Sequence, residues 1–166
     1  RQDLTDIPQI VYGVNLGITW KQFDLSLLFQ GQAKVINTIQ ETWVDPSSGG
    51  AGNLMQWWTE DMWTPENTDG TKPRLGTPNK INGTTFTNIN AAFFKLKNAE
   101  IGYTLPVAVR EKIGVANARV YLSGTNLFSF DHMRGIGIEP EATGSGYGGW
   151  ALNPQRLINL GVNVSF

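Results

Sequence analysis

The sequence contains no cysteine, which excludes disulfide bonds, thiolate nucleophiles and zinc–thiolate sites. It also has no apolar run near the roughly 18 residues that a membrane-spanning helix requires, so any contact with lipid must be made by strands. Charged residues make up only 16% of the chain, against roughly 25% in a typical soluble protein. The formal net charge is −1 and the basic residues are scattered, so no nucleic-acid partner is expected.

The last residues, 156–166, alternate almost perfectly between apolar and polar side chains, which is the two-residue period of a β-strand. One face would carry Ile158, Leu160, Val162, Val164 and Phe166, and the other Asn159, Gly161, Asn163 and Ser165. The small polar face and the length of about 10 residues are typical of a tilted strand that crosses a membrane. A half-buried strand of a soluble β-sandwich would show the same alternation, so the pattern alone leaves both alternatives open.

Residues 9–20 repeat this alternation, with an aromatic residue at each end of the apolar face. Tyr12 and Trp20 are eight residues apart, which is roughly 26 Å along a strand and close to the roughly 25 Å apolar band of a membrane barrel. Their amphipathic rings suit the two water interfaces of a bilayer. Two core aromatics of a soluble sandwich remain the alternative interpretation.

Five strands are predicted in all, at about 9–20, 23–31, 92–105, 117–129 and 155–166. Lys21 and Gln22 would form a tight hairpin, and Pro106 would end the third strand before a short connection with one helical turn. The apolar residues of the third strand change parity, which predicts a bulge near Lys97 and Asn98. The other two connections, about 32–91 and 130–154, are long and polar, as the external loops of a membrane barrel are.

Five strands are too few to close a membrane barrel, and the single-chain bacterial barrels have an even number of at least eight. The sequence also begins at Arg1 rather than at a methionine. We therefore expect an all-β antiparallel meander that is a piece of a larger protein.

Several stretches together resemble the C-terminal end of the SusC/RagA family of TonB-dependent outer-membrane transporters. In order, they are residues 63–67 (WTPEN), 73–75 (PRL), 94–98 (FKLKN), 101–106 (IGYTLP), 113–114 (IG), 119–128 (RVYLSGTNLF), 154–156 (PQR) and 161–166 (GVNVSF). One departure is Asn153, which stands before Pro154 where the family usually has an aromatic residue. The resemblance covers the chain from about Trp63 to its end.

The resemblance implies that the chain forms the last five strands of a 22-stranded transmembrane β-barrel in the cell outer membrane. The whole protein would import oligosaccharides or peptides, together with a SusD-like surface lipoprotein and with TonB. The plug domain and the TonB-contacting segment of the family are absent from this sequence. Phe166 resembles the terminal aromatic residue that the barrel-assembly machinery recognises.

Two sets of candidate functional residues follow from these interpretations. Polar residues expected to line the lumen are Asp24, Gln30, Arg119, Tyr121, Asn159 and Asn163. Loop tryptophans that could contact a ligand or a partner are Trp43, Trp57, Trp58 and Trp63. The alternative for the tryptophans, which we favour, is that they form the loop's own core. A short helix at about 53–63, capped by Asn53 and closed by Pro65, would carry the middle pair.

No enzymatic activity, cofactor or metal site is expected. His132 is the single histidine and has no partner pattern, and Glu139 and Glu141 lie in a glycine-rich loop where carboxylates are usually solvated. An outer-membrane hydrolase that uses these two glutamates is a minor hypothesis. The main alternative to the transporter is a secreted β-sandwich carbohydrate-binding module, whose apolar face would be covered by a second sheet.

Overall fold

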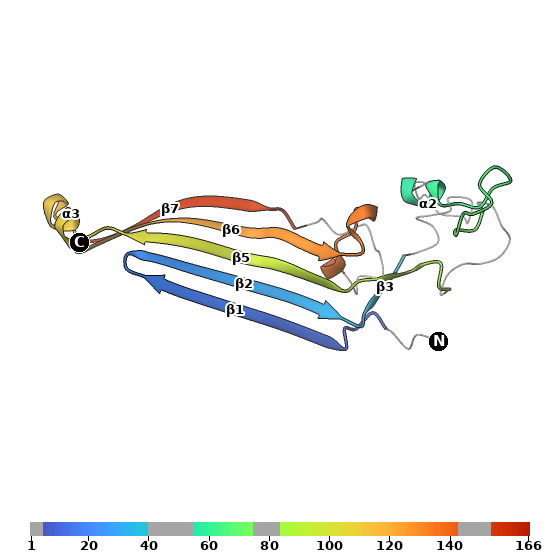
Figure 1. Cartoon of the computed structure of the whole chain (residues 1–166), viewed down its shortest axis with the longest axis horizontal. Coiled ribbons are helices and arrows are strands. Elements are labelled where there is room, and N and C mark those ends of the chain that lie inside the picture. The colour runs from blue at the N-terminus through green and yellow to red at the C-terminus, as the bar shows by residue number, and fades with distance from the viewer. Residues whose placement is uncertain (1–4, 40–54, 75–83, 143–153) are drawn as a thin grey trace. The chain divides into compact units, whose positions relative to one another are not determined.

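The computed structural model describes residues 5–39, 55–74, 84–142 and 154–166 (Figure 1). Its main sheet consists of β1 (Ile10–Trp20), β2 (Phe23–Ala33), β5 (Phe93–Thr104), β6 (Asn117–Asp131) and β7 (Leu157–Ser165). These strands lie in the order β1-β2-β5-β6-β7, which is also their order along the chain, and neighbouring strands are hydrogen-bonded. The predicted antiparallel meander is therefore confirmed. β2 and β6 each continue two residues beyond the ends expected from the sequence.

Two short connections join strands of this sheet. Between β1 and β2, Lys21 has a φ of 54°, a left-handed value that closes the two-residue turn without the usual asparagine-glycine pair. Between β5 and β6, helix α3 (Val107–Ile113) begins after Pro106 and ends at Gly114, which has a φ of 71°. Glycine adopts this C-terminal capping conformation without steric cost. The helix is longer than the single turn that we expected.

Strand β5 contains the slip in side-chain parity that the sequence indicates. Phe94 stacks on Phe29 with ring centroids 5.3 Å apart, and Tyr103 contacts Phe23 at 4.7 Å. Phe23 and Phe29 are six residues apart and share a face of β2. Phe94 and Tyr103 are nine apart, however, and would point to opposite faces of a regular strand. Both contact the same face of β2, so β5 shifts by one residue between Phe94 and Tyr103, where the bulge was predicted.

Strand β6 contains a second irregularity, at Asn126, which the sequence analysis did not predict. Asn126 has a φ of 52°, which asparagine tolerates better than most residues do. A side chain at Gly124 would overlap Leu127, so Leu127 lies against Gly124 although the two are three residues apart. The left-handed residue between them therefore returns Leu127 to the face of Gly124. The Asn126 side chain also donates a hydrogen bond to the Gln155 carbonyl oxygen (3.2 Å).

The described parts of the two long connections form a second compact unit. It contains β3 (Ile36–Thr38) and β4 (Asn88–Asn90), which pair antiparallel, helix α2 (Gln56–Glu60), and the 3-10 turns η2 (Arg134–Ile136) and η3 (Pro140–Ala142). Its buried core consists of Val35, Ile39, Trp58, Ala91, Met133 and Ile138. The long loops therefore have a hydrophobic core of their own.

Helix α2 is shorter than expected and is capped differently. Its N-cap is Met55, whose side chain makes no capping hydrogen bond, and Asp61 follows its last residue. The predicted cap, Asn53, lies outside the described residues. Only five residues are helical, and the helix ends at Glu60, ahead of Pro65. None of the helices in the described residues is long and apolar enough to span a membrane.

Candidate functional site

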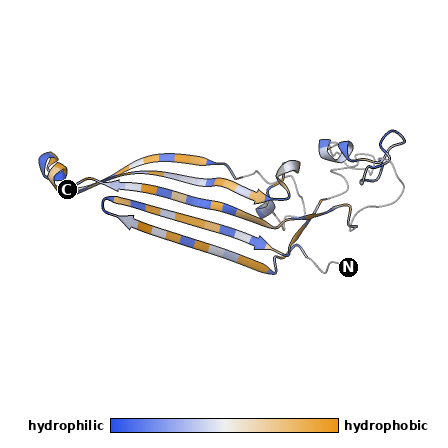
Figure 2. Cartoon of the chain, viewed as in Figure 1, coloured by the Kyte–Doolittle hydropathy of each residue, from blue (hydrophilic) through white to orange (hydrophobic). Residues whose placement is uncertain are grey.

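The pairing of β6 with β7 divides the side chains of these strands between two faces. Directly opposite residues of an antiparallel pair share a face. On the first face, Arg119 lies opposite Asn163, Tyr121 opposite Gly161, and Ser123 opposite Asn159. On the second face, Val120 lies opposite Val162, Leu122 opposite Leu160, and Gly124 opposite Ile158. We call these the polar face and the apolar face; the alternation along the strands is visible in Figure 2.

A charge cluster occupies the polar face across three strands. Arg119 of β6 donates from Nε to Asp24 Oδ1 of β2 (3.0 Å), and its Nη2 contacts the other oxygen of the same carboxylate. The Nη2 group also donates to Glu100 Oε1 of β5 at 2.7 Å. The guanidinium thus makes a two-pronged contact with one carboxylate and a single contact with a second. With two carboxylates and one guanidinium, the cluster has a surplus negative charge.

Two glycines give the long side chains of this cluster room to lie flat on the sheet. A side chain at Gly102 would overlap the Arg119 guanidinium, and a side chain at Gly161 would overlap the Tyr121 ring. The Arg119 Cζ atom lies 5.1 Å from the centre of the Tyr121 ring, a cation–π distance. The arginine is therefore held by hydrogen bonds on one side and by an aromatic ring on the other.

The structure brings together most of the residues predicted to line a lumen. Asp24, Arg119 and Tyr121 form the cluster, and Asn159 and Asn163 extend the same face along β7. Gln30 is half-buried in β2, at the same parity as Asp24 and six residues further along.

Glu100 and Gln32 were not among the site residues predicted from the sequence. Glu100 lies beyond the parity slip in β5, and this slip decides that its side chain shares a face with Arg119. Gln32 is buried in the loop unit, where its side-chain amide donates to the carbonyl oxygens of Ala91 (3.1 Å) and Pro140 (3.3 Å). Gln32 was not predicted because it lies past the expected end of β2 at residue 31.

The apolar face is uncovered in the described part of the chain. Leu16, Val120 and Val162 are 47%, 38% and 61% exposed, respectively. In a soluble sandwich these side chains would be packed against a second sheet. Among the described residues, no second sheet covers these side chains as the sandwich alternative would require.

No known protein-family profile matches the sequence. Two curated relatives do, both from Formosa agariphila. The TonB-dependent receptor P26 is 30% identical over 172 residues, and the TonB-dependent receptor P3 is 29% identical over 177 residues. Each alignment covers 96% of this chain but only 17% and 16% of the respective receptor.

Solved structures of the RagAB peptide importer match as well. The 'open-open' state aligns with a TM-score of 0.73 and 27% identity, covering 96% of this chain and 17% of that one. The 'closed-closed' state aligns with a TM-score of 0.76 and 26% identity, covering 99% and 18%.

The predicted resemblance to TonB-dependent receptors of the SusC/RagA family is confirmed. The predicted localisation in the cell outer membrane is confirmed with it, because such receptors are outer-membrane proteins. The chain spans less than a fifth of the length of the proteins that it matches.

Aromatic residues stand at both ends of β1 in this SusC/RagA-like sheet. Tyr12 donates a hydrogen bond from its hydroxyl to the Phe93 carbonyl oxygen (2.9 Å), and its ring lies over Gly31. At the other end, Trp20 is exposed, with the Lys21 Nζ atom 5.0 Å from its ring centre. Rings with one polar edge in these positions are typical of the aromatic belts of membrane proteins.

The loop tryptophans of the SusC/RagA-like chain differ in exposure. Trp58 is 1% exposed in the core of the loop unit, and Trp57 packs against it edge to face at 5.6 Å. Lys72 lies over both rings. Trp63 is 44% exposed, and Trp43 lies outside the described residues. Trp58 therefore has no ring face available for a ligand, whereas Trp63 has one.

An ordered turn follows helix α2. The Asp61 carboxylate accepts hydrogen bonds from the Thr71 hydroxyl and from the Thr71 backbone N–H (3.1 Å for the latter). These bonds, chiefly the one from the hydroxyl, lower the pKa of Asp61 below its usual value because they favour the charged form. In this turn Met62 and Lys72 form a single β-bridge, and the backbone N–H of Trp63 donates to the Lys72 carbonyl oxygen (2.9 Å).

The residues considered for catalysis lie in the second long connection. His132 is exposed, and Glu139 and Glu141 flank Pro140, which is buried and accepts a hydrogen bond from Gln32. In the described ranges, no three histidine, aspartate or glutamate side chains are grouped as a metal site would require.

Proposed function

We propose that the intact protein is a TonB-dependent nutrient importer of the outer membrane, and that this chain forms part of its barrel wall. The observation that carries the proposal is the two-sided sheet, whose apolar face is uncovered and whose polar face holds the Arg119 cluster. Similarity to TonB-dependent receptors over 96% of the chain supports the same function. The wall is a passive element of transport, and we assign it no enzymatic role.

The apolar face would contact lipid and the polar face would line the lumen. Lipid tails cannot accept hydrogen bonds, so a charged side chain on the lipid side would be costly. The cluster of Asp24, Glu100 and Arg119 avoids that cost if it faces water. Asn159 and Asn163 would continue this hydrated wall.

The substrate class that we propose is a peptide or an oligosaccharide. The RagAB structures are described as those of a peptide importer, at 26–27% identity to this chain, which favours peptides. The exposed ring of Trp63 would suit stacking on a sugar and keeps oligosaccharides as the second candidate. A SusD-like lipoprotein at the external loops and TonB acting on the plug complete the proposed assembly.

Uptake by cells tests this function. A strain that lacks the intact gene should lose uptake of either a fluorescent oligopeptide or a fluorescent oligosaccharide, and the gene should restore it. Restoration should fail when the TonB-contacting segment of the full-length protein is deleted, because energy coupling depends on it. Normal uptake of both substrate classes in the deletion strain would contradict the proposal.

A further inference from the structure

We propose that the apolar face carries a binding groove for one acyl chain of a membrane phospholipid. The proposal rests on the lipid-facing assignment made above, and it adds a defined site to that face. The groove crosses β2, β5, β6 and β7, and it lies within the main sheet.

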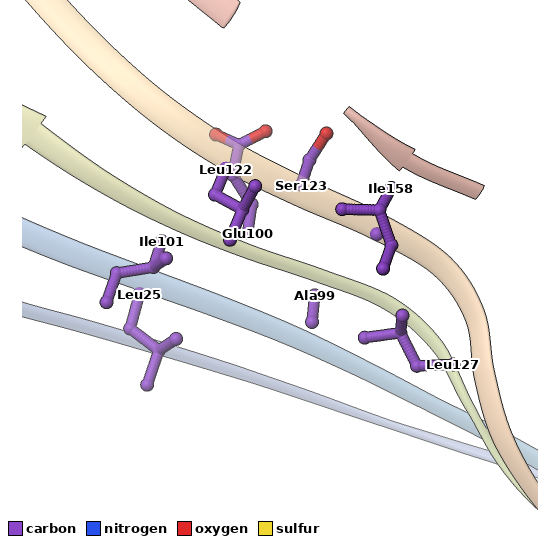
Figure 3. Close-up of a pocket in the computed structure, with 9 residues that line it drawn as sticks. Leu25, Ala99, Glu100, Ile101, Leu122, Ser123, Leu127 and Ile158 are labelled. Carbon is purple, nitrogen blue, oxygen red and sulfur yellow. The ribbon is translucent and has the colours of Figure 1, made fainter. Parts of the chain in front are cut away.

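The groove has a volume of about 210 Å³ and an apolar lining. Its lining side chains on the apolar face are Leu25, Ala99, Ile101, Leu122, Leu127 and Ile158 (Figure 3). Glu100 and Ser123 also border it, but Figure 3 shows their oxygens directed away from Leu25, Ala99 and Leu127. The Glu100 carboxylate instead binds Arg119 on the polar face. The inner surface of the groove is therefore hydrocarbon.

Two local features create the hollow. Ala99 has only a methyl group on this face, so little side chain stands above the sheet at this position of β5. The left-handed backbone at Asn126 then turns Leu127 back over Gly124, which raises a wall at one end of the groove. Leu25 and Ile158 close the sides from β2 and β7.

The chemistry and size of the groove favour an acyl chain over other occupants. An apolar cavity of roughly 150 Å³ holds a benzene ring in an engineered protein, so this groove suits a segment of a hydrocarbon chain. A stable protein partner would need roughly 800 Å² on each side, far more than nine lining residues provide. Leu160 lies opposite the lining residue Leu122, and both Leu160 and Val162 are exposed on the face that the proposed function places against lipid tails.

The gain from filling the groove is expected to be modest. Lipid tails are as apolar as leucine, so no hydrophobic driving force favours the groove over the rest of the face. Additional van der Waals contacts remain, because a chain in the groove touches protein on several sides. We expect about a threefold preference, which corresponds to roughly 0.6 kcal/mol.

Photolabelling of the full-length protein tests the groove. In nanodiscs of phosphatidylethanolamine with a diazirine in one acyl chain, mass spectrometry would map the labelled residues. Labelling of Leu25 and Leu122, corrected for exposed area, should exceed that of Leu16 by about threefold. Ala99→Leu should remove the excess because it fills the groove, whereas Val162→Leu, outside the groove, should leave it unchanged.

A second variant keeps the test valid if Ala99→Leu fails to assemble into a folded barrel. Gly124→Ala adds a methyl group that overlaps Leu127, so the wall of the groove must shift and the excess should also be lost. Heat-modifiable gel mobility would verify that each barrel is folded. Labelling in proportion to exposure, or labelling only by a lipid A analogue, would overturn the groove while leaving the proposed function intact. Labelling at Asn159 and Asn163 would instead overturn the assignment of the two faces.

Discussion

At the scale of single residues, Arg119 connects three strands of the polar face. Its guanidinium binds Asp24 and Glu100 and lies over Gly102. The cluster therefore depends on the absence of a side chain at Gly102 as well as on the three charged side chains. Arginine suits this position because its planar fork meets a carboxylate with two parallel hydrogen bonds, which lysine cannot do.

Replacing this arginine tests its contribution. Arg119→Met should lower the unfolding free energy of the full-length barrel by up to about 1 kcal/mol, because partly exposed ion pairs are screened by water. Arg119→Lys should recover only part of the loss. Urea unfolding in lipid vesicles, followed by tryptophan fluorescence, would measure both. A more stable Arg119→Met protein would contradict the bridging role.

Asn126 supports a second prediction at this scale. Asn126→Val should destabilise the barrel by about 1–3 kcal/mol, because a β-branched residue is strained at positive φ. Asn126→Gly is the matched control, since glycine takes this conformation freely and loses only the hydrogen bond to Gln155. The same unfolding assay would measure both variants. Equal losses for the two would show that the hydrogen bond, rather than the backbone conformation, matters at this site.

At the scale of elements, the strands could be predicted from the alternation of apolar and polar side chains, whereas the structure of the loops could not. The five-stranded meander was predictable because apolar residues in β1 and β7 recur every second position without interruption. The slip in β5 was also visible, since Phe94 and Tyr103 have opposite parity. The slip at Asn126 was hidden, because Leu127 and Phe128 are adjacent and both apolar. Glu100 and Gln32 were not predicted, because the face of Glu100 depends on the slip in β5 and Gln32 lies past the expected end of β2.

The cap of helix α2 was predicted wrongly in the loop unit. The sequence predicted a cap at Asn53, but the N-cap is Met55, whose own side chain makes no capping hydrogen bond. The helix is stabilised by the burial of Trp58 in the loop core, so tertiary packing outweighs the local signal.

The loop core gives a test at the scale of elements. Trp58→Ala should make the external loops of the full-length protein sensitive to protease, because removal of a buried tryptophan costs about 3–5 kcal/mol. Trp63→Ala should leave protease resistance unchanged, since that ring is exposed. Limited proteolysis of intact cells would compare the two variants. Equal sensitivity would mean that Trp58 does not stabilise the loops.

At the scale of the whole molecule, the proposed function requires that the apolar face of the sheet meets lipid. The uncovered apolar residues, the aromatic ends of β1 and the charge cluster on the opposite face all favour the same orientation. The two curated receptors and the RagAB structures match the sheet over nearly its whole length, but the chain is less than a fifth of each. Substrate choice and partners belong to the intact protein and require experiments on it.

A pair of arginine substitutions in β7 tests the orientation most directly. Leu160→Arg should destabilise the assembled barrel by roughly 2–4 kcal/mol if Leu160 lies near the middle of the membrane, because a charge is forced into hydrocarbon. Asn163→Arg, on the polar face of the same strand, should cost much less because the charge remains in water. Reversible unfolding of the full-length protein in lipid vesicles would measure both free energies. A clear difference in this direction is the predicted result, and equal costs at Leu160 and Asn163 would contradict the lipid-facing assignment.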